Sequence, residues 1–511
     1  MGELLLELLS EEIPARMQRR AIADLTGLLE AGLAAAEIPA ESLHGSVTPR
    51  RLAVIARGIA KRQPARREER RGPRFGAPRQ AIDGFLRAAG LERIEECEIR
   101  ETERGAFYFA ILKRPGREAA EILPELIGAA VAGLPWPKSM RFPATSLRWV
   151  RPLNSVICLF DGAILPLAAT AVGDRIPVGR STRGHRFLSQ GPIVVANAGD
   201  YLDRLESAHV VLDPDKRRGR IARELDGLAA AEGLVVKPDP ALLEEVTGLV
   251  EFPVVLKGVI DAAAMALPPE VLATAMRTHQ RYFSALDRAG RPAPRFLFVA
   301  NNLTPDHGRT IVAGNERVLR ARLADARFFW EQDRKMPLAQ RVEALAGRVF
   351  HARLGSTLGS VRDKVRRLEL LAGFLVPHVP GADGERARRA AHLAKADLST
   401  GLVGEFPELQ GIIGRYCALD DGEDPRVADA IAEHYKPLGP NDTCPTAPDS
   451  IVVALADKLD SLWALFAIGE RPSGSRDPYA LRRAALGLIR LILENRLRLP
   501  LAAAFARAAE A

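Results

Sequence analysis

The chain has little cysteine and no long apolar run. Its 511 residues include four cysteines, and no two of them form a CxxC pair. Neither a zinc ribbon nor a disulfide framework is therefore indicated, and we expect reduced thiols in a cytoplasmic protein. No window reaches the apolar length of a membrane span, so no membrane contact is expected. The N-terminal run MGELLLELLSEEIP lacks a basic start and carries Glu3 and Glu7, which predicts a strand and not a secretory signal.

The common phosphate-binding and hydrolytic signatures are also missing. The sequence contains no G-x-x-x-x-G-K-[ST], no G-x-G-x-x-G after a strand, no H-E-x-x-H and no G-x-S-x-G. A self-contained ATP-using enzyme of this length is expected to show at least one of them. The sequence therefore does not predict a nucleotide-dependent catalytic core in this chain.

Positive charge is present in excess. The formal net charge is +8, from 72 Lys and Arg against 64 Asp and Glu. A basic chain of this size suggests an anionic partner, with nucleic acid first. High arginine and alanine also fit GC-rich coding, so charge alone leaves nucleic-acid binding open.

Periodicity predicts a multidomain chain with an α+β first part and an all-α second part. Predicted strands lie at 3–9, 50–59, 106–113, 252–260, 280–286 and 295–301, with a hairpin over 155–172 that turns at Asp161-Gly162. Predicted helices of the first part lie at 15–37, 118–134, 199–207, 215–232, 239–249 and 268–277. Those of the second part lie at 317–335, 341–350, 360–378, 384–406, 425–435, 448–468 and 478–495.

Several short runs combine arginine or lysine with an aromatic residue, histidine or glycine. They are TPRRLAV (48–54), LPWPKSMRF (134–142), GRSTRGHRF (179–187) and MRTHQRYF (276–283), and RREERRGPRF (66–75) is more mixed. Each run alone fits a solvated loop. Together they suit an RNA surface, because arginine contacts phosphate and planar groups stack on unpaired bases. The candidate RNA-binding residues are Arg50, Arg51, Lys138, Arg141, Arg183, Arg186, Arg277 and Arg281.

One set of residues in the second part is a weak candidate for a metal site. His392 and Asp397, with Asp457 and Asp460, could bind a divalent ion for phosphoester hydrolysis. Ala396 stands where a neighbouring histidine ligand is needed, and a spacing of five does not place His392 and Asp397 on one helix face. We therefore expect capping and surface carboxylates, and we predict no metal residues.

The run GSRDPYALRRAALGLIRLI (474–492) predicts a helix with a clear start. Asp477 is a good N-cap and Pro478 suits the first helical position. An apolar stripe that includes Leu481, Leu488 and Ile492 predicts packing into a core. The arginines lie outside this stripe on the predicted helix. We expect Arg482 and Arg483 to pair with carboxylates, and the alternatives are RNA contact and simple solvation.

These runs, in this order, resemble a known family. They include LLLELLSEEIPARM, TPRRLAV, LPWPKSMRF followed by VRPL, STRGHRF, LPPEVLATAMRTHQRYF, GNERVLRARLADARFFWEQDRK, LGSTLGSVRDK, KADLSTGLVGEFPELQGIIGRYCA and GSRDPYALRRAALG. So many ordered matches are more specific than any single motif. The sequence resembles the β subunits of the bacterial-type tetrameric glycyl-tRNA synthetase.

The resemblance implies a function that composition does not show. In this family a separate α subunit carries the class II catalytic core that uses ATP and Mg, and the β subunit contributes recognition of tRNA(Gly). The resemblance thus implies an α2β2 assembly in the cytoplasm, with no catalytic residue, metal or cofactor in this chain. The chain would act as the non-catalytic subunit of an aminoacyl-tRNA synthetase and would be inactive by itself.

The resemblance also implies a domain organisation. Residues 1–335 are expected to form an α+β region with B3/B4-like and accessory tRNA-binding parts, and 336–511 an all-α, degenerate HD-like domain. The family's C-terminal anticodon-binding domain is expected to be absent. Ala396 departs from the histidine of an active HD enzyme, so no hydrolase residues are carried over.

Two alternatives remain open at this point. One is an HD-type metal-dependent phosphohydrolase that acts on nucleotides or RNA ends, which needs a divalent ion near His392, Asp397 and Asp457. The other is a structural assembly chain without RNA contact. Bound metal would favour the first, and salt-dependent tRNA binding would count against the second.

Overall fold

The computed structural model describes residues 1–103, 105–114, 116–141, 147–167, 172, 176–351, 358–474 and 476–511, with the backbone alone at 66–68 and 112–114. Four of the stretches discussed above extend outside these residues, at Phe142, 168–171, 354–357 and Ser475. None of the described helices is both long and apolar enough to cross a membrane.

The chain forms two compact units. The first is Met1–Glu232, Pro238–Leu256 and Phe298–Gly308, and the second is Gly233–Lys237, Lys257–Leu297 and Arg309–Ala511. These units are defined by contacts and not by fold type. The division into 1–335 and 336–511 and the B3/B4-like and HD-like assignments therefore stay predictions.

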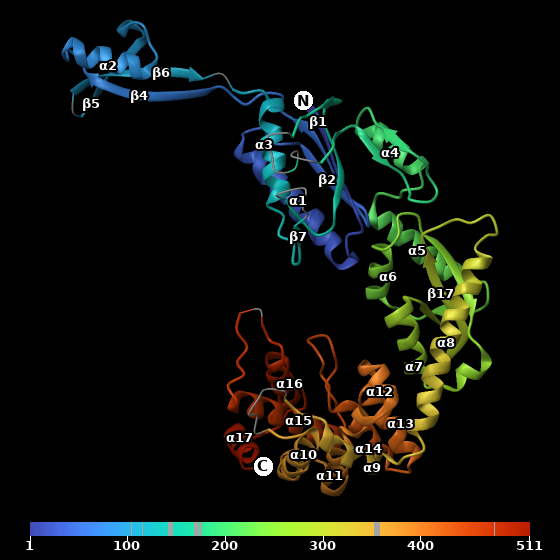
Figure 1. The fold of residues 1–511 in the computed structure, drawn as a ribbon. Helices are drawn as coiled ribbons and strands as arrows, with labels where there is room; N and C mark the ends of the chain where they lie inside the picture. The colour runs from blue at the N-terminus through green and yellow to red at the C-terminus, as the bar shows by residue number, and fades with distance from the viewer. Residues whose placement is uncertain are drawn as a thin grey trace. The chain divides into compact units, whose positions relative to one another are not determined.

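A six-stranded sheet forms the centre of the first unit (Figure 1). Its strands follow the order β10-β9-β1-β3-β2, and β11 pairs with β9 in parallel. Their bounds are β1 (Gly2–Ser10), β2 (Ser42–Thr48), β3 (Arg51–Ile59), β9 (Leu153–Phe160), β10 (Ala163–Ile164) and β11 (Val178–Gly179). The strands predicted at 3–9 and 50–59 are confirmed. The sequence pattern misses β2, because glycine and polar residues interrupt its apolar alternation.

Helices cover both faces of this sheet, which explains the nearly continuous apolar run of β1. They are α1 (Ala15–Ala35), α3 (Ala119–Ala132) and α4 (Ala198–Ser207). Leu4, Leu6 and Leu8 belong to the core with α1 and α3, while Leu5 packs with α4 on the other face. Each fully buried leucine contributes about 2 kcal/mol of apolar burial.

The predicted hairpin turn is confirmed. Asp161 and Gly162 have φ values of 48° and 76° and join β9 to β10. Positive φ at both central residues is the requirement of a type I′ turn. The other elements of this unit are α5 (Pro214–Ala230), α6 (Pro240–Thr247), the paired β7 (Met140–Arg141) and β8 (Arg148–Trp149), and the paired β12 (Ser181–Arg183) and β13 (Pro192–Val194).

A small three-stranded antiparallel sheet with one helix is inserted between β3 and α3 (Figure 1). Its order is β4-β6-β5, from β4 (Arg66–Arg74), β5 (Cys97–Thr102) and β6 (Gly105–Arg114), and its helix is α2 (Arg79–Ala89). The pattern predicts only β6, because β4 reads RREERRGPR and has no apolar alternation. Gly72 makes room for α2, since a Cβ there would lie 2.5 Å from the Phe85 ring.

A four-stranded sheet follows with the order β14-β16-β17-β15. The strands are β14 (Val235–Val236), β15 (Val254–Val259), β16 (Phe283–Leu286) and β17 (Pro292–Ala300). The helix predicted at 268–277 begins as α7 (Pro269–Thr274) and continues as a π-helical segment over Ala275–Gln280.

The predicted helical second part is confirmed. Its helices are α8 (Arg309–Asp333), α9 (Leu338–Ala344), α10 (Val361–Leu375), α11 (Gly384–Leu393), α12 (Gly401–Glu405), α13 (Ile412–Asp420), α14 (Pro425–Glu433), α15 (Pro448–Ala467), α16 (Leu481–Glu494) and α17 (Leu501–Glu510). The prediction of one helix over 384–406 is wrong. The Asp333 carboxylate accepts the backbone N–H groups of Gly401 and Leu402 at 2.9 and 2.8 Å, which starts a separate helix at this point.

The helix predicted at 478–495 begins three residues later, at Leu481. Ala480 has a φ of 56°, so the chain is not yet helical there. The Asp477 carboxylate accepts the N–H groups of Leu481 and Arg482 at 2.8 and 3.0 Å and so still caps the helix. Leu481 and Leu488 are buried as predicted.

Among the residues that the structure describes, the Arg482 side chain has no carboxylate partner, contrary to the prediction. This exposed side chain donates to the Gly474 carbonyl at 2.5 Å, and Arg483 is also exposed. Arg490 instead holds the loop that precedes α15, because it donates to the carbonyls of Gly439 and Asp442 at 3.0 and 2.8 Å. Arg482 and Arg490 therefore tie loops to α16.

Candidate nucleic-acid interface

A buried ion network lies under the run 48–54. Arg51, at the start of β3, contacts Glu7 of β1 and Glu251 at 3.1 Å each. Thr48 donates to Glu251 at 2.8 Å, and the Tyr201 hydroxyl donates to Glu7 at 2.5 Å. Burial alone would raise the pKa of Glu251, but the charge of Arg51 and the Thr48 bond hold it below its usual range. Each buried charge thus has a partner, as burial requires.

The prediction that Arg51 contacts RNA is corrected by this network. Its side chain is 0% exposed, so it offers no surface to a phosphate. Arg51 also donates to the Arg183 carbonyl at 3.0 Å, so it positions the loop 179–187 in place of the predicted contact. Its neighbour Arg50 is largely buried, lies 3.8 Å from Glu251 and donates to the Gly184 carbonyl at 3.5 Å. Burial lowers the pKa of Arg50. The RNA contact of Arg50 stays a prediction.

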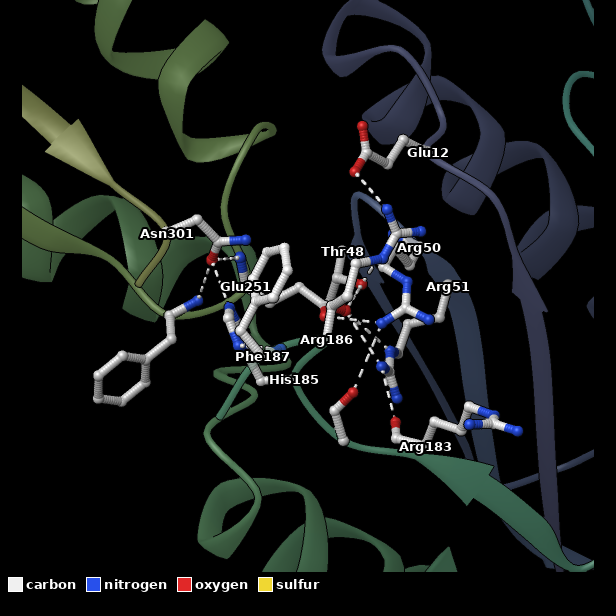
Figure 2. A network of polar contacts seen from close by, with 12 residues as sticks. Glu12, Thr48, Arg50, Arg51, Arg183, His185, Arg186, Phe187, Glu251 and Asn301 are labelled. Carbon is white, nitrogen blue, oxygen red and sulfur yellow. Dashed lines mark hydrogen bonds and ion pairs between the residues drawn. The ribbon is translucent and has the colours of Figure 1, made fainter. Parts of the chain in front are cut away.

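His185 fixes the same loop from inside (Figure 2). Its Nδ1 accepts the backbone N–H groups of Phe187 and Leu188 at 3.3 and 3.2 Å, so the ring proton lies on Nε2. Nε2 then donates to the Asn301 side-chain oxygen at 3.0 Å. The same oxygen accepts the backbone N–H of Glu251 at 2.9 Å. One asparagine therefore connects the loop to the segment that supplies the carboxylate of the ion network.

The outer side of the loop carries exposed groups. Arg183 and Arg186 are exposed, and the Phe187 ring is 69% exposed. Arg186 pairs with Glu11 at 2.8 Å and approaches Glu12 at 3.7 Å, both at the surface. This side of the loop therefore combines cationic groups with a free aromatic face.

A cavity of ≈ 690 Å³ opens beside these residues. Its lining includes Glu11, Arg50, Asn154, Arg183, His185 and Arg186. The runs 48–54 and 179–187, far apart in the sequence, thus meet at one place, together with the segment after VRPL (150–153). Arginine around a concave surface suits an anionic ligand such as a phosphate backbone.

Lys138 and Arg141 form a separate exposed group in the first unit. Arg141 of β7 pairs with Arg148 of β8, so two exposed arginines lie side by side. Trp136 packs edge-on against the buried Trp149, with ring centroids 5.0 Å apart, and anchors the proline-containing loop. Sequence reasoning missed Arg148, although it stands beside Trp149 in the aromatic–basic run RWVR (148–151).

Arg277 and Arg281 belong to the second unit. Arg277 is exposed on the π-helical segment, and Arg281 follows it with a φ of 60°. The Arg281 guanidinium donates to the Thr278 carbonyl, which closes the end of the segment. His279 packs edge-on against Phe406 at 5.9 Å. The run is therefore an ordered turn with an exposed arginine.

Asp397 and Asp460 of the weak metal candidate are buried and the Asp457 side chain is only 13% exposed, which corrects the expectation of surface carboxylates. Asp397 accepts the backbone N–H groups of Gly411 and Gly414 at 2.5 and 3.0 Å, and burial raises its pKa to about 6. His392 contacts Glu369 at 2.8 Å. In the part of the chain that the structure describes, no three His, Cys, Asp or Glu residues lie together as metal ligands would.

Lysines neutralise the other two carboxylates. Asp457 lies 3.1 Å from Lys364 and 3.0 Å from Lys395. Asp460 contacts Lys364 at 2.8 Å and Arg367 at 2.5 Å. Ammonium groups thus occupy the space where a divalent ion would bind these carboxylates. Nothing in this arrangement favours the phosphohydrolase alternative.

Comparison with known proteins agrees with the resemblance. The family model described as glycyl-tRNA synthetase beta subunit matches residues 4–511. The glycine–tRNA ligase beta subunit of Rhodospirillum centenum is 51% identical and aligns over 100% of this chain and 74% of its own length. Those of Paracoccus denitrificans and Phenylobacterium zucineum are 49% and 50% identical, over 99% and 98% of this chain and 74% of their own lengths. The chain belongs to the glycyl-tRNA synthetase beta subunit family.

Proposed function

We propose that this chain, as the beta subunit of a glycine–tRNA ligase, binds tRNA(Gly) and positions it for glycylation by an alpha subunit. The observation that carries the proposal is the basic loop 179–187, which presents Arg183, Arg186 and Phe187 beside the cavity. The arginines would contact phosphates, and the phenyl ring would stack on an unpaired base. Holding the acceptor end in one orientation would lower the entropic part of the barrier on the alpha subunit.

The buried network supports this role by keeping the loop rigid before RNA binds. A loop that is already ordered loses less conformational entropy when it binds. The pair between Arg186 and Glu11 lies at the surface, with side chains 42% and 44% exposed. Exposed pairs contribute at most about 1 kcal/mol, so a phosphate can displace the Glu11 carboxylate.

ATP and Mg²⁺ would act on the alpha subunit, within a cytoplasmic α2β2 assembly. The absence of phosphate-binding signatures from the sequence supports this division of labour. We propose no cofactor for this chain. Lys138, Arg141, Arg277 and Arg281 remain candidates for further tRNA contacts.

Charge reversal at the loop tests the proposal. The double variant Arg183→Glu/Arg186→Glu is expected to weaken tRNA(Gly) binding about 100-fold or more and to reduce the salt slope by about one per lost phosphate contact. The matched control is Arg204→Glu/Arg291→Glu, which reverses two surface arginines paired four residues away on their own segments. Equal affinity and equal salt slope for the two double variants would refute the proposed site.

A further inference from the structure

The small β4-β6-β5 sheet has two different faces. Arg70 of β4 is the cross-strand neighbour of Ala110 on β6 and donates to the Ala88 carbonyl of α2 at 2.8 Å. The side chains on this face include Tyr108 and Ala110, which are buried. The helix therefore covers the Tyr108 face, and Phe107 and Phe109 point to the opposite face.

That opposite face alternates phenyl rings with guanidinium groups. The Arg71 guanidinium carbon lies 3.7 Å from the centroid of the Phe107 ring, and that of Arg74 lies 6.0 Å from it. The Arg100 guanidinium carbon lies 5.4 Å from the centroid of the Phe109 ring. We call these five residues the aromatic–arginine face.

The charges around this face favour an anionic partner. Strand β4 contains five arginines and two glutamates in nine residues. Glu69 and Glu98 contact Arg100 at 3.0 and 2.6 Å, while Arg71 and Arg74 are exposed. Arginine and aromatic residues also occur in protein interfaces, so it is the excess of positive charge on β4 that favours RNA. Guanidinium groups flank each ring, which matches the alternation of planar bases and phosphates in RNA.

We propose that the aromatic–arginine face binds unpaired nucleotides of an RNA strand. A base would stack on the Phe107 and Phe109 rings or on the guanidinium plane of Arg71, and Arg74 would contact a neighbouring phosphate. The bases must be unpaired, because a duplex exposes its phosphates but hides the faces of its bases. This surface is a second RNA site that stands on its own contacts and does not depend on the cavity beside loop 179–187.

The test uses the full chain and an unstructured RNA decamer as probe, with a 12-base-pair RNA duplex for comparison. The variant Phe107→Leu/Phe109→Leu keeps apolar bulk but removes both flat rings. It is expected to bind the decamer at least about tenfold more weakly with an unchanged salt slope, because phenylalanine carries no charge. Duplex binding is expected to stay the same. The matched control is Phe328→Leu/Phe466→Leu, which alters two exposed phenyl rings of the second unit.

The variant Arg74→Gln separates charge from stacking, because Arg74 is the residue proposed to contact a phosphate. It is expected to weaken decamer binding about fivefold and to lower the salt slope by about 0.7, as loss of one phosphate contact on a single strand requires. Unchanged decamer affinity in the leucine variant would overturn the proposal. Loss of alpha-subunit binding with unchanged RNA affinity would also overturn it, because the face would then be a protein contact.

Cross-linking of the unaltered chain covers the case in which the leucine variant does not fold. A 4-thiouridine decamer is expected to cross-link within 105–111, and cross-links confined to other segments would overturn the proposal. The variant Arg183→Glu/Arg186→Glu is expected to keep decamer binding. Failure of that variant to change tRNA(Gly) binding would therefore refute the cavity proposal alone, whereas unchanged decamer binding by the leucine variant would refute this one alone.

Discussion

The two units both bury charge, but with different cations. In the first unit Arg51 lies between Glu7 and Glu251, and in the second Lys364 and Lys395 share Asp457. Burial alone would lower the pKa of Arg51, but its two carboxylates more than offset this effect, and the pKa is raised. Burial lowers the pKa of Lys395 to about 8 in spite of Asp457. The Arg51 guanidinium therefore keeps its charge, whereas Lys395 can lose a proton.

The networks also differ in what they support. The arginine network connects through Glu251 and Asn301 to a loop with exposed cationic groups. The lysine cluster is enclosed: Lys395 donates to His434 Nε2 at 2.7 Å and lies 3.8 Å from the Tyr435 ring centroid. His434 Nδ1 donates to a carbonyl, which leaves Nε2 free to accept. One network thus orders a candidate binding surface, while the other holds helices together.

The largest expected effect comes from breaking the arginine network. Arg51→Met leaves Glu7 and Glu251 buried without their main partner and should lower the free energy of unfolding by about 3–5 kcal/mol. Urea denaturation measures it. The control is Arg57→Met on the same strand, whose pair with Glu3 is exposed and contributes at most about 1 kcal/mol. An effect no larger than that of the control would show that the buried arginine network contributes no more stability than a surface pair.

The lysine cluster should make stability depend on pH above neutrality. The pKa of Lys395 is about 8 in the folded chain against the usual lysine value of 10.5, so the unfolded chain binds the proton more tightly between these values. The free energy of unfolding should therefore rise by roughly 1 kcal/mol per pH unit from about pH 8 to about 10.5. Urea denaturation across this range compares the unaltered chain with Lys395→Met. If the free energy of unfolding depended on pH equally in the two proteins, Lys395 would not be the group with the lowered pKa.

Asn301 tests the connection between the network and the loop. Asn301→Ala removes the acceptor of His185 Nε2 and of the Glu251 backbone N–H, and should cost about 1–3 kcal/mol. Amide hydrogen exchange at 185–188 should become faster, and tRNA binding should weaken several-fold. Asn302→Ala, at the next position, is the control. Unchanged exchange in the Asn301 variant would show that the loop is ordered by other contacts.

The smallest expected change in stability is at the surface pair. Glu11→Gln should alter the free energy of unfolding by less than about 1 kcal/mol, because its partner Arg186 is exposed. Affinity for tRNA(Gly) should rise about two- to fivefold, since a phosphate no longer competes with the Glu11 carboxylate. Filter binding at fixed salt measures it. Weaker tRNA binding would mean that Glu11 orients Arg186 instead of competing for it.

Sequence patterns predicted the elements whose signals are local. The strand at 3–9 follows from its apolar pattern. The turn follows from the pair Asp161-Gly162, which favours positive φ. The capping role of Asp477 follows from a carboxylate close to the N–H groups at the start of a helix. The pattern failed for β4, whose RREERRGPR run has no apolar alternation. It also failed at 384–406, where Asp333, distant in the sequence, caps a new helix.

The candidate site shows a similar limit. Glu7 within an apolar strand was a signal that a buried cation must lie nearby, because a buried carboxylate needs a partner. The residues adjacent to Glu7 in the sequence do not indicate that Arg51 is this cation. Asn301 carried no signal at all, since nothing in its own run, FLFVANN, marks it as an acceptor for His185 and the Glu251 N–H.

The sequence by itself determined the family, the change from mixed strands and helices to helices alone, and the places where basic residues cluster. These properties depend on local periodicity and on ordered runs of residues. The tertiary structure alone decided which cations face outward, because the partners of Arg51 and Lys395 are 200 and 62 positions away in the chain. Arg51 is buried because it pairs with these distant carboxylates. Arg183 and Arg186 have no such buried partner among the described residues and are exposed.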